Sequence, residues 1–417
     1  MTGESEMPAM EPSAPPSAAP GMGGDADGMP APIATGATTV RATTTTTTTV
    51  TVTVEGGPPP PAQRIQPVHR LLTAASVGDS DRRGNYLDFL QRQTFEGRSL
   101  GLDMTRRIRF RVVDPQGRPV HGARLLLEGL GVEGRSHADG VWDFYPGVSA
   151  PHWQGGAQVA VSFGGRMLGR TEVHIPARGD GQDVTIVLNG VQAESPRALD
   201  LAFVIDATGS MEDELRYVNR EIGEIVARIR AEAPETLVRV GAVFYRDRTD
   251  SAPIQRIAFT SDIAGFARAM QSVAANGGGD YPEDMSLGLE AALHQLSWSD
   301  DRALKVAVLV ADAPPQHYGT QFTYRDAMRE ASTRGIRILP VAASGANRQV
   351  EYLFRAMGSM TSTPYVYLTD DSGIGGRHLE ADTDRVAIEY LSDLLTRLVA
   401  SDLRGQGMHE PGPFGPA

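Results

Sequence analysis

Residues 199–211 read Leu-Asp-Leu-Ala-Phe-Val-Ile-Asp-Ala-Thr-Gly-Ser-Met, and the organisation of the chain can be worked out from them. The apolar run 201–205 predicts a strand that is covered on both faces of a sheet. Asp206 follows directly, where that strand would end, and Thr208 and Ser210 follow at alternate positions. A glycine between the two hydroxyl residues allows a tight turn. One carboxylate and two hydroxyls near one point are the oxygen ligands that a small hard cation takes.

Strand and helix patterns alternate after this stretch. Apolar segments predict parallel strands at 199–205, 238–244, 305–311, 336–341 and 365–368. A shorter alternating run at 255–259 predicts an antiparallel edge strand. Helical stripes fall between the strands, at 215–229, 285–296, 324–334 and 388–398. This alternation predicts an α/β fold with a doubly wound, mostly parallel, Rossmann-like sheet.

Polar residues follow several of these predicted strands. Asp312 comes directly after the strand 305–311, and Tyr245, Arg246 and Asp247 end the strand 238–244. A glycine loop at 277–279 leads to Asp280 and then to a helix. Ligands of open α/β sheets bind outside the carboxyl ends of the strands, so these side chains are expected to gather around one crevice.

This three-loop pattern resembles the metal-ion-dependent adhesion site of von Willebrand factor type A domains, over about half the chain. Asp206-Ala-Thr208-Gly-Ser210 is similar to the family's Asp-x-Ser/Thr-x-Ser motif. The resemblance implies metal ligands in the first loop (Asp206, Thr208 and Ser210), in the second (Asp280) and in the third (Asp312). The family's second loop usually offers a threonine. The Gly-Gly-Gly-Asp-x-Pro-Glu form found here resembles a bacterial and protist branch, and it leaves the ligand at position 280 open.

The resemblance implies a binding protein and not an enzyme. A Mg²⁺ ion, or Ca²⁺ or Mn²⁺, would keep one coordination position open for an acidic side chain of a protein partner. Tyr245, Arg246 and Asp247 could contact that partner, or could form a solvated loop with an internal Arg–Asp pair. The alternative for the proposed ligands is structural: Asp206 and Ser210 would cap the following helix, and Asp312 would cap a turn before Pro314.

Two other functions remain open. A metal-dependent hydrolase could use the same crevice, because carboxylates and a divalent ion can activate water. A structural envelope protein with an inactive metal site is the third hypothesis. The sequence has no Gly-x-Ser-x-Gly around Ser210 and no Gly-x-x-x-x-Gly-Lys loop, which argues against an α/β-hydrolase and a P-loop nucleotide hydrolase.

Residues 103–190 are predicted to form a smaller all-β sandwich. Segments 108–112 and 158–163 alternate with period two, and Asp114-Pro-Gln-Gly117 is a turn sequence. The segment from Val113 to Ala123, followed by Ala138-Asp-Gly-Val-Trp-Asp-Phe144, resembles a carboxypeptidase regulatory-like (transthyretin-like) domain. Its aromatic residues Trp142 and Phe144 are expected in the core.

The remaining regions complete the predicted organisation. Residues 1–62 form a low-complexity tail that is expected to be disordered, 63–102 a short helical segment, 196–403 the type A domain and 404–417 a second disordered tail. The 417 residues carry a net charge of −12 and no cysteine, which argues against a general nucleic-acid binder and excludes disulfides and thiolate metal sites. No apolar run approaches the ~20 residues of a membrane span. The N-terminus lacks a signal-peptide pattern, whereas the sandwich family favours the cell envelope or the exterior.

Overall fold

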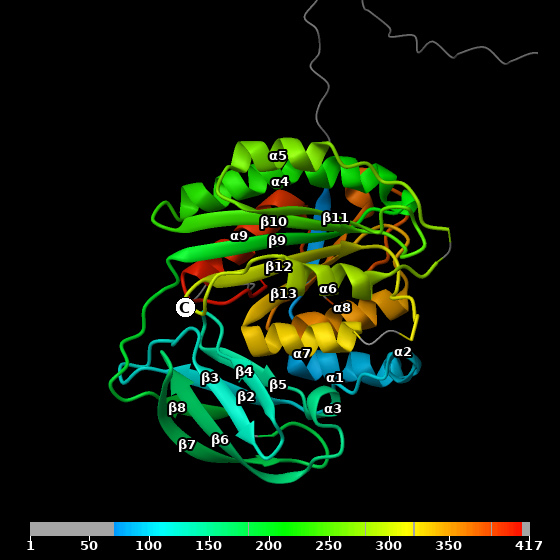
Figure 1. Ribbon diagram of the computed structural model, residues 1–417. Coiled ribbons are helices and arrows are strands. Elements are labelled where there is room, and N and C mark those ends of the chain that lie inside the picture. Colours follow the sequence, from blue (N-terminus) through cyan, green and yellow to red (C-terminus); the bar gives the residue numbers. More distant parts are fainter. Residues whose placement is uncertain (1–70, 182, 280, 320–321, 385, 411–417) are drawn as a thin grey trace, which may run out of the picture. The chain divides into compact units, whose positions relative to one another are not determined.

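A central sheet of eight strands carries the fold in the computed structural model, which describes residues 71–410 except 182, 280, 320, 321 and 385 (Figure 1). The strand order is β11-β10-β9-β12-β13-β14-β1-β15, with parallel pairing from β10 to β14 and antiparallel pairing at both edges. All six strands predicted for this sheet are present: β9 (Ala198–Asp206), β10 (Leu237–Tyr245), β11 (Ile254–Thr260), β12 (Leu304–Ala311), β13 (Ile336–Ala342) and β14 (Tyr365–Leu368). The prediction of an α/β fold with a large, mostly parallel sheet is therefore confirmed.

Helices cover both faces of this sheet (Figure 1). Along β9, Leu201, Phe203 and Ile205 enter one apolar core, while Ala202 and Val204 enter the other, as expected for a strand buried on both sides. The first core is closed by α4 (Glu212–Glu232), α5 (Ile263–Gln271) and α9 (Leu391–Leu403). The second is closed by α6 (Met285–Gln295), α7 (Tyr324–Arg334), α8 (Arg348–Met360) and two helices from the N-terminal side. No described helix is long and apolar enough to cross a membrane.

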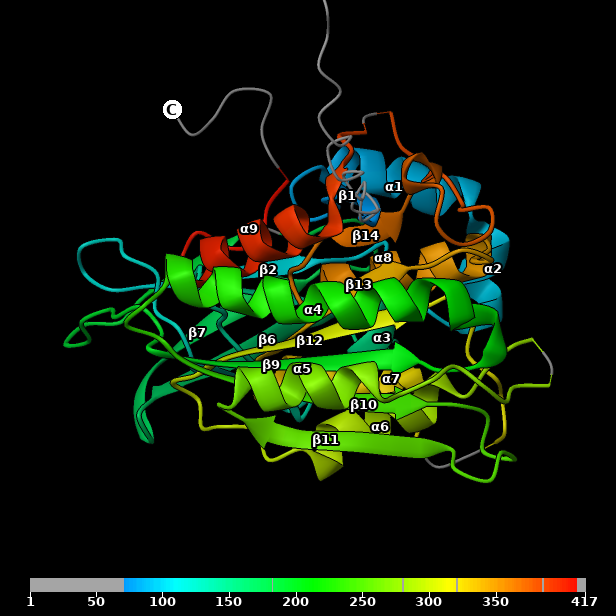
Figure 2. The same cartoon turned by 90° about the horizontal axis from the view of Figure 1, so that it is seen from above.

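The segment expected to be only helical, 63–102, also supplies a strand to the sheet. Strand β1 (Thr73–Val77) lies between β14 and β15 (Glu389–Tyr390), antiparallel to both. Figure 2 shows it on the side of the sheet away from β11. Helices α1 (Arg83–Arg92) and α2 (Thr94–Leu100) follow and pack on the face of α8. The strand Thr-Ala-Ala-Ser-Val is short and weakly apolar, so its long-range pairing left no clear signal in the sequence.

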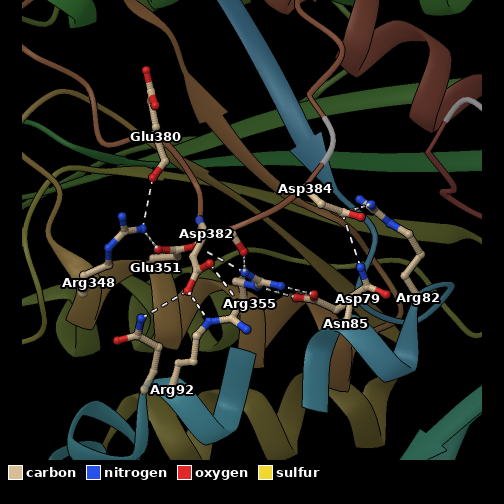
Figure 3. A network of polar contacts seen from close by, with 11 residues as sticks. Asp79, Arg82, Asn85, Arg92, Arg348, Glu351, Arg355, Glu380, Asp382 and Asp384 are labelled. Carbon is tan, nitrogen blue, oxygen red and sulfur yellow. Dashed lines mark hydrogen bonds and ion pairs between the residues drawn. The ribbon is translucent and has the colours of Figure 1, made fainter. Parts of the chain in front are cut away.

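A buried ionic network fixes this N-terminal segment to α8 (Figure 3). The guanidinium of Arg355 donates to both carboxylate oxygens of Asp79, at 2.9 and 2.5 Å, and to Glu351 at 3.2 Å. All three side chains are at most 3 % exposed. Arg92 of α1 extends the network through two hydrogen bonds to Asp382, at 3.0 and 2.9 Å. Because each buried charge has an opposite partner, the segment is held at a defined position on α8.

A smaller β-domain occupies the predicted region and consists of two sheets around one apolar core. One sheet contains β2 (Ile108–Val113), β5 (Val141–Phe144) and β8 (Val184–Val187); the other contains β3 (Arg124–Glu128), β4 (Val132–Arg135), β6 (Gly155–Phe163) and β7 (Arg166–Ile175). A one-turn helix, α3 (Pro146–Ser149), follows β5. Trp142 and Phe144 are buried in this core, as predicted, and Trp142 stacks on Phe110 with ring centroids 5.2 Å apart. The finer resemblance to a carboxypeptidase regulatory-like domain stays a prediction.

Polar contacts join the β-domain to α7 and β13. The indole nitrogen of Trp142 donates to the Ser332 hydroxyl at 2.8 Å, and Thr333 donates to the Glu133 carbonyl at 3.1 Å. Arg337 is fully buried and pairs with Asp139 of the β-domain at 3.2 Å and with Asp402 at 2.6 Å. Since Trp142, Ser332 and Arg337 are buried, the contacts of these three residues fix the β-domain against the sheet.

The structure describes part of the predicted C-terminal tail but none of the predicted N-terminal tail. Residues 1–62 lie outside the described residues, as do 411–417. Residues 404–410, expected to be disordered, instead pack against the turn after β1: His409 bonds Asp81 at 2.8 Å, and Glu410 accepts from the Gly78 amide at 2.6 Å. The expectation was wrong for residues 404–410, because their order depends on contacts with residues that are distant in the sequence.

Candidate metal-binding crevice

The first predicted loop forms a compact turn at the carboxyl end of β9. The backbone amide of Thr208 donates to Asp206 Oδ1 at 3.0 Å, and its hydroxyl donates to the same oxygen at 2.7 Å. The Ser210 hydroxyl lies 3.2 Å from the Thr208 hydroxyl. A 3-10 turn, Gly209–Met211, then leads into α4 without a side-chain cap at either helix start. The three oxygen-bearing side chains therefore face one another, and the helix-capping alternative has no hydrogen bond to support it.

The third loop brings Asp312 to the same place from the next strand. Asp312 follows β12, which pairs directly with β9, and the Ser210 hydroxyl approaches its carboxylate. Asp206 is fully buried and Asp312 is 3 % exposed. Asp206 Oδ2 and Asp312 Oδ1 are both buried without a hydrogen-bond partner among the described residues. Burying two carboxylate oxygens without hydrogen-bond partners costs free energy of folding. This pair of oxygens therefore points to a ligand in the crevice.

The pKa values of the two carboxyl groups also show that burial disfavours their ionised forms. Burial, followed by the nearby charge of Asp312, raises the pKa of Asp206 to about 7, although the Thr208 donors act in the opposite direction. Burial also raises the pKa of Asp312, and the neighbouring carboxylate of Glu214 adds to that rise. The Tyr245 phenol lies near enough to Asp206 to lower its pKa, but outside hydrogen-bond geometry. A bound cation would reverse these penalties, because it favours the ionised carboxylates.

The glycine loop lies directly against the first loop. The Gly209 amide donates to the Gly277 carbonyl at 3.1 Å, and the Gly278 amide donates to Asp250 at 3.0 Å. Gly278 has a φ of +68°, and a Cβ there would lie 3.0 Å from Thr208 Cβ. Glycine is thus required both by the backbone conformation and by the close approach. Asp280, the ligand predicted from this loop, lies outside the described residues.

The three residues proposed for partner contact are buried beside the crevice. Tyr245 is fully buried, and Arg246 and Asp247 are 5 % and 2 % exposed. Arg246 donates to the carbonyls of Ala207, Asn276, Ala252 and Ala274, at 2.9 to 3.3 Å, and so joins the first loop to the glycine loop. Asp247 accepts from Thr249 and from the Tyr318 hydroxyl. These contacts give Arg246 and Asp247 a positioning role, and the internal Arg–Asp pair proposed as an alternative is not among them.

The crevice is also lined by three residues that the sequence analysis did not identify. Glu214, in the first turn of α4, is 1 % exposed and accepts from the Ser344 amide at 3.2 Å and from the Ser344 hydroxyl. Ser344 follows β13, so the strand-end rule could have identified it. Tyr281 is half exposed and donates to the Gly345 carbonyl at 3.4 Å, and partial burial, followed by the charge of Asp312, raises its pKa to about 12.

The donor set suits a hard cation. Mg²⁺ and Ca²⁺ bind oxygen ligands, and Asp206, Thr208, Ser210 and Asp312 offer two carboxylates and two neutral hydroxyls at one crevice. The described residues contain no group of three or more histidine, aspartate or glutamate side chains placed to hold a metal. A site here would therefore depend on the hydroxyls as well as on the carboxylates, which excludes preference for a soft metal.

Comparisons with known proteins agree with the fold. Residues 200–373 match the family model described as von Willebrand factor A domain. The chain is 22 % identical over 175 residues to the alpha-protein kinase vwkA of Dictyostelium discoideum, which covers 42 % of this chain and 27 % of that protein. It is 31 % identical over 124 residues to a putative ariadne-like RING finger protein, R811, of Acanthamoeba polyphaga mimivirus, which covers 30 % of this chain and 12 % of that protein.

A solved structure is similar at a much lower level. The pilus adhesin SpaC from Lactobacillus rhamnosus GG gives a TM-score of 0.35 at 12 % identity, covering 60 % of this chain and 32 % of that one. The chain spans about a quarter of the length of the kinase vwkA and about an eighth of the length of the RING finger protein R811. The matched residues 200–373 include most of β9, the glycine loop and Asp312, and the match supports a von Willebrand A-type domain over these residues.

Proposed function

We propose that the crevice binds a divalent cation, Mg²⁺ or else Ca²⁺ or Mn²⁺, and that this cation captures an acidic side chain of a protein partner. The observation that supports the proposal is the pair of buried, unpartnered oxygens, Asp206 Oδ2 and Asp312 Oδ1, on adjacent strand ends. A von Willebrand A-type domain suggests a protein-interaction or adhesion module.

Different residues of the chain would have different roles at this site. Asp206 and Asp312 supply the charge that holds the cation, while Thr208 and Ser210 supply neutral oxygens and so leave the cation electrophilic toward an incoming carboxylate. Arg246 and the glycine loop keep the first two loops in register. The half-exposed Tyr281 lies at the rim, where a partner's side chain would pass it.

The chain offers a matched pair of variants for testing the metal site. Thr208 donates amide and hydroxyl to Asp206 Oδ1 at 3.0 and 2.7 Å, and Thr249 donates to Asp247 Oδ1 at 2.9 and 2.7 Å. Thr208→Val and Thr249→Val therefore remove equivalent hydrogen bonds, but only the first removes a proposed ligand. Thermal unfolding of the full chain is measured in EDTA and with each ion added.

Binding to the folded state alone should stabilise the wild type by about 2.7 kcal/mol at a hundredfold excess of ion over its dissociation constant. Thr249→Val should keep this gain and Thr208→Val should lose most of it. Equal gains in both variants, or no gain in the wild type, would rule out the assigned site. Partner capture is tested next, with a fluorescent peptide that carries one glutamate and the matching glutamine peptide, each in Mg²⁺ and in EDTA. Binding of both peptides alike would reject capture through an acidic residue.

A further inference from the structure

A second polar cavity lies at the other end of the sheet from the crevice. It encloses about 190 Å³, well above the space that one water needs, beside the turn that precedes β14. Its walls come from the turn after β1, from β2 and the turn that follows it, from the start of β5, from the turn before β14 and from the segment after α9. Parts of the chain that are far apart in sequence therefore meet around it.

Two serine hydroxyls of this cavity lack partners. Ser362 is 8 % exposed, and its buried hydroxyl has no hydrogen-bond partner among the described residues; the buried hydroxyl of Ser80 has none either. Ser362 also has a φ of 55°, a left-handed conformation that costs a non-glycine residue about 1 kcal/mol or more. A buried hydroxyl held in this conformation at a cavity wall is available to donate to a ligand.

The charges around the cavity leave one cation without a partner. Arg109 is held by Asp143 at 2.8 and 2.7 Å, and the cavity's Asp139 is paired with Arg337. Asp81 is paired with His409, whose pKa is raised chiefly by that hydrogen bond. Arg111 is also part of the lining and is exposed, and its guanidinium forms no hydrogen bond or ion pair with any described residue.

We propose that this cavity binds a small oxyanion, a phosphate or carboxylate group, through Arg111 with the Ser362 and Ser80 hydroxyls. Arginine matches the planar geometry of two anionic oxygens, and the hydroxyl donors that come from other segments of the lining complete the site. Among the described residues, the other charged side chains of the lining each have an oppositely charged partner, although Asp139 shares Arg337 with Asp402, so Arg111 is the one whose guanidinium is open to an anion. The site is separate from the metal crevice and does not depend on it.

The test is calorimetric titration of the full chain with inorganic phosphate and, separately, with acetate. EDTA keeps divalent ions out of the crevice, and constant ionic strength removes general screening. Arg111→Gln removes the cation. Arg166→Gln is its matched control, because Arg166 is an exposed arginine of β7 whose guanidinium has no ion pair or hydrogen bond to a described residue. Ser362→Gly removes the hydroxyl while glycine accepts the same φ without strain.

We expect saturable one-site binding of at least one anion, and the stronger of the two identifies the group. Arg111→Gln should weaken it about tenfold or more, since it removes a charged hydrogen-bond donor. Ser362→Gly should weaken it several-fold, and Arg166→Gln should leave it unchanged. No saturable binding of either anion, equal affinity in Arg111→Gln and wild type, or equal loss in Arg111→Gln and Arg166→Gln would overturn the proposal.

Discussion

Replacing Asp206 with asparagine should have opposite effects on stability with and without metal. The pKa of Asp206 rises from 3.8 to about 7 in the folded chain, chiefly by burial. A carboxyl whose folded pKa is raised favours folding only when protonated, so stability is lost as pH rises from about 4 through about 7. About three pKa units correspond to a penalty on the order of 4 kcal/mol at pH 8.

Asparagine removes this penalty at a smaller cost. Its carbonyl oxygen can still accept from the Thr208 amide and hydroxyl, as Asp206 Oδ1 does. Its amide group would replace Oδ2, which has no partner, at a cost of about 1–3 kcal/mol. We therefore expect Asp206→Asn to be more stable than wild type by about 1–3 kcal/mol in EDTA at pH 8, and to gain little from Mg²⁺.

The measurement is thermal unfolding of both proteins at several pH values, with EDTA or Mg²⁺. At about 2.1 cal/mol/K per residue over roughly 340 residues, 2 kcal/mol corresponds to a Tm shift of about 3 °C. The advantage of the variant in EDTA should shrink toward pH 4, where the wild-type carboxyl is protonated. A variant that is less stable than wild type in EDTA at pH 8, by an amount independent of pH, would refute the reasoning.

Three other substitutions test the supports of the fold and the crevice. Arg355→Ala leaves the buried Asp79 unpaired and should lower the free energy of unfolding by about 3–5 kcal/mol, as measured by denaturant unfolding. A loss under about 1 kcal/mol would show that water replaces the guanidinium. Gly278→Ala should abolish stabilisation by Mg²⁺, because its φ is +68° and its Cβ would press on the first loop, whereas Gly279→Ala, with open space around it, should not. Trp142→Phe removes the indole donor to α7 and should cost about 1–3 kcal/mol; an unchanged midpoint would mean that this contact is dispensable.

The sequence predicted those parts of the fold that depend on local pattern. The strands around Leu201, Val306 and Ile336 stand out because their sequences are mostly apolar. Asp206 and Asp312 could be placed together because parallel strands end at one edge. The strand Thr73–Val77 and helix α8 were not predicted. The first has few large apolar side chains, and the second depends on tertiary contacts of an almost wholly buried helix.

The roles of individual crevice residues were harder to predict than their position. Tyr245, Arg246 and Asp247 occur at a strand end, where partner contact was a reasonable hypothesis. Only the three-dimensional arrangement shows that Arg246 reaches four carbonyl groups and that the other two side chains face inward. Burial of a charged side chain is set by segments distant in sequence, and one sequence does not contain that information.

The position of β1 gives the chain a particular order of assembly. Val77 pairs with Tyr365, so this strand waits for a partner that is synthesised 288 residues later (365 − 77), and the whole β-domain emerges in between. At about 5–20 residues per second, that wait is roughly 15–60 s. The β-domain can form its own sheets during this time, but the A-type sheet cannot be completed at its β14 side. A nascent chain therefore exposes an unpaired strand edge until almost the last residues of the domain are made, and this is the period in which it is most open to aggregation or to a chaperone.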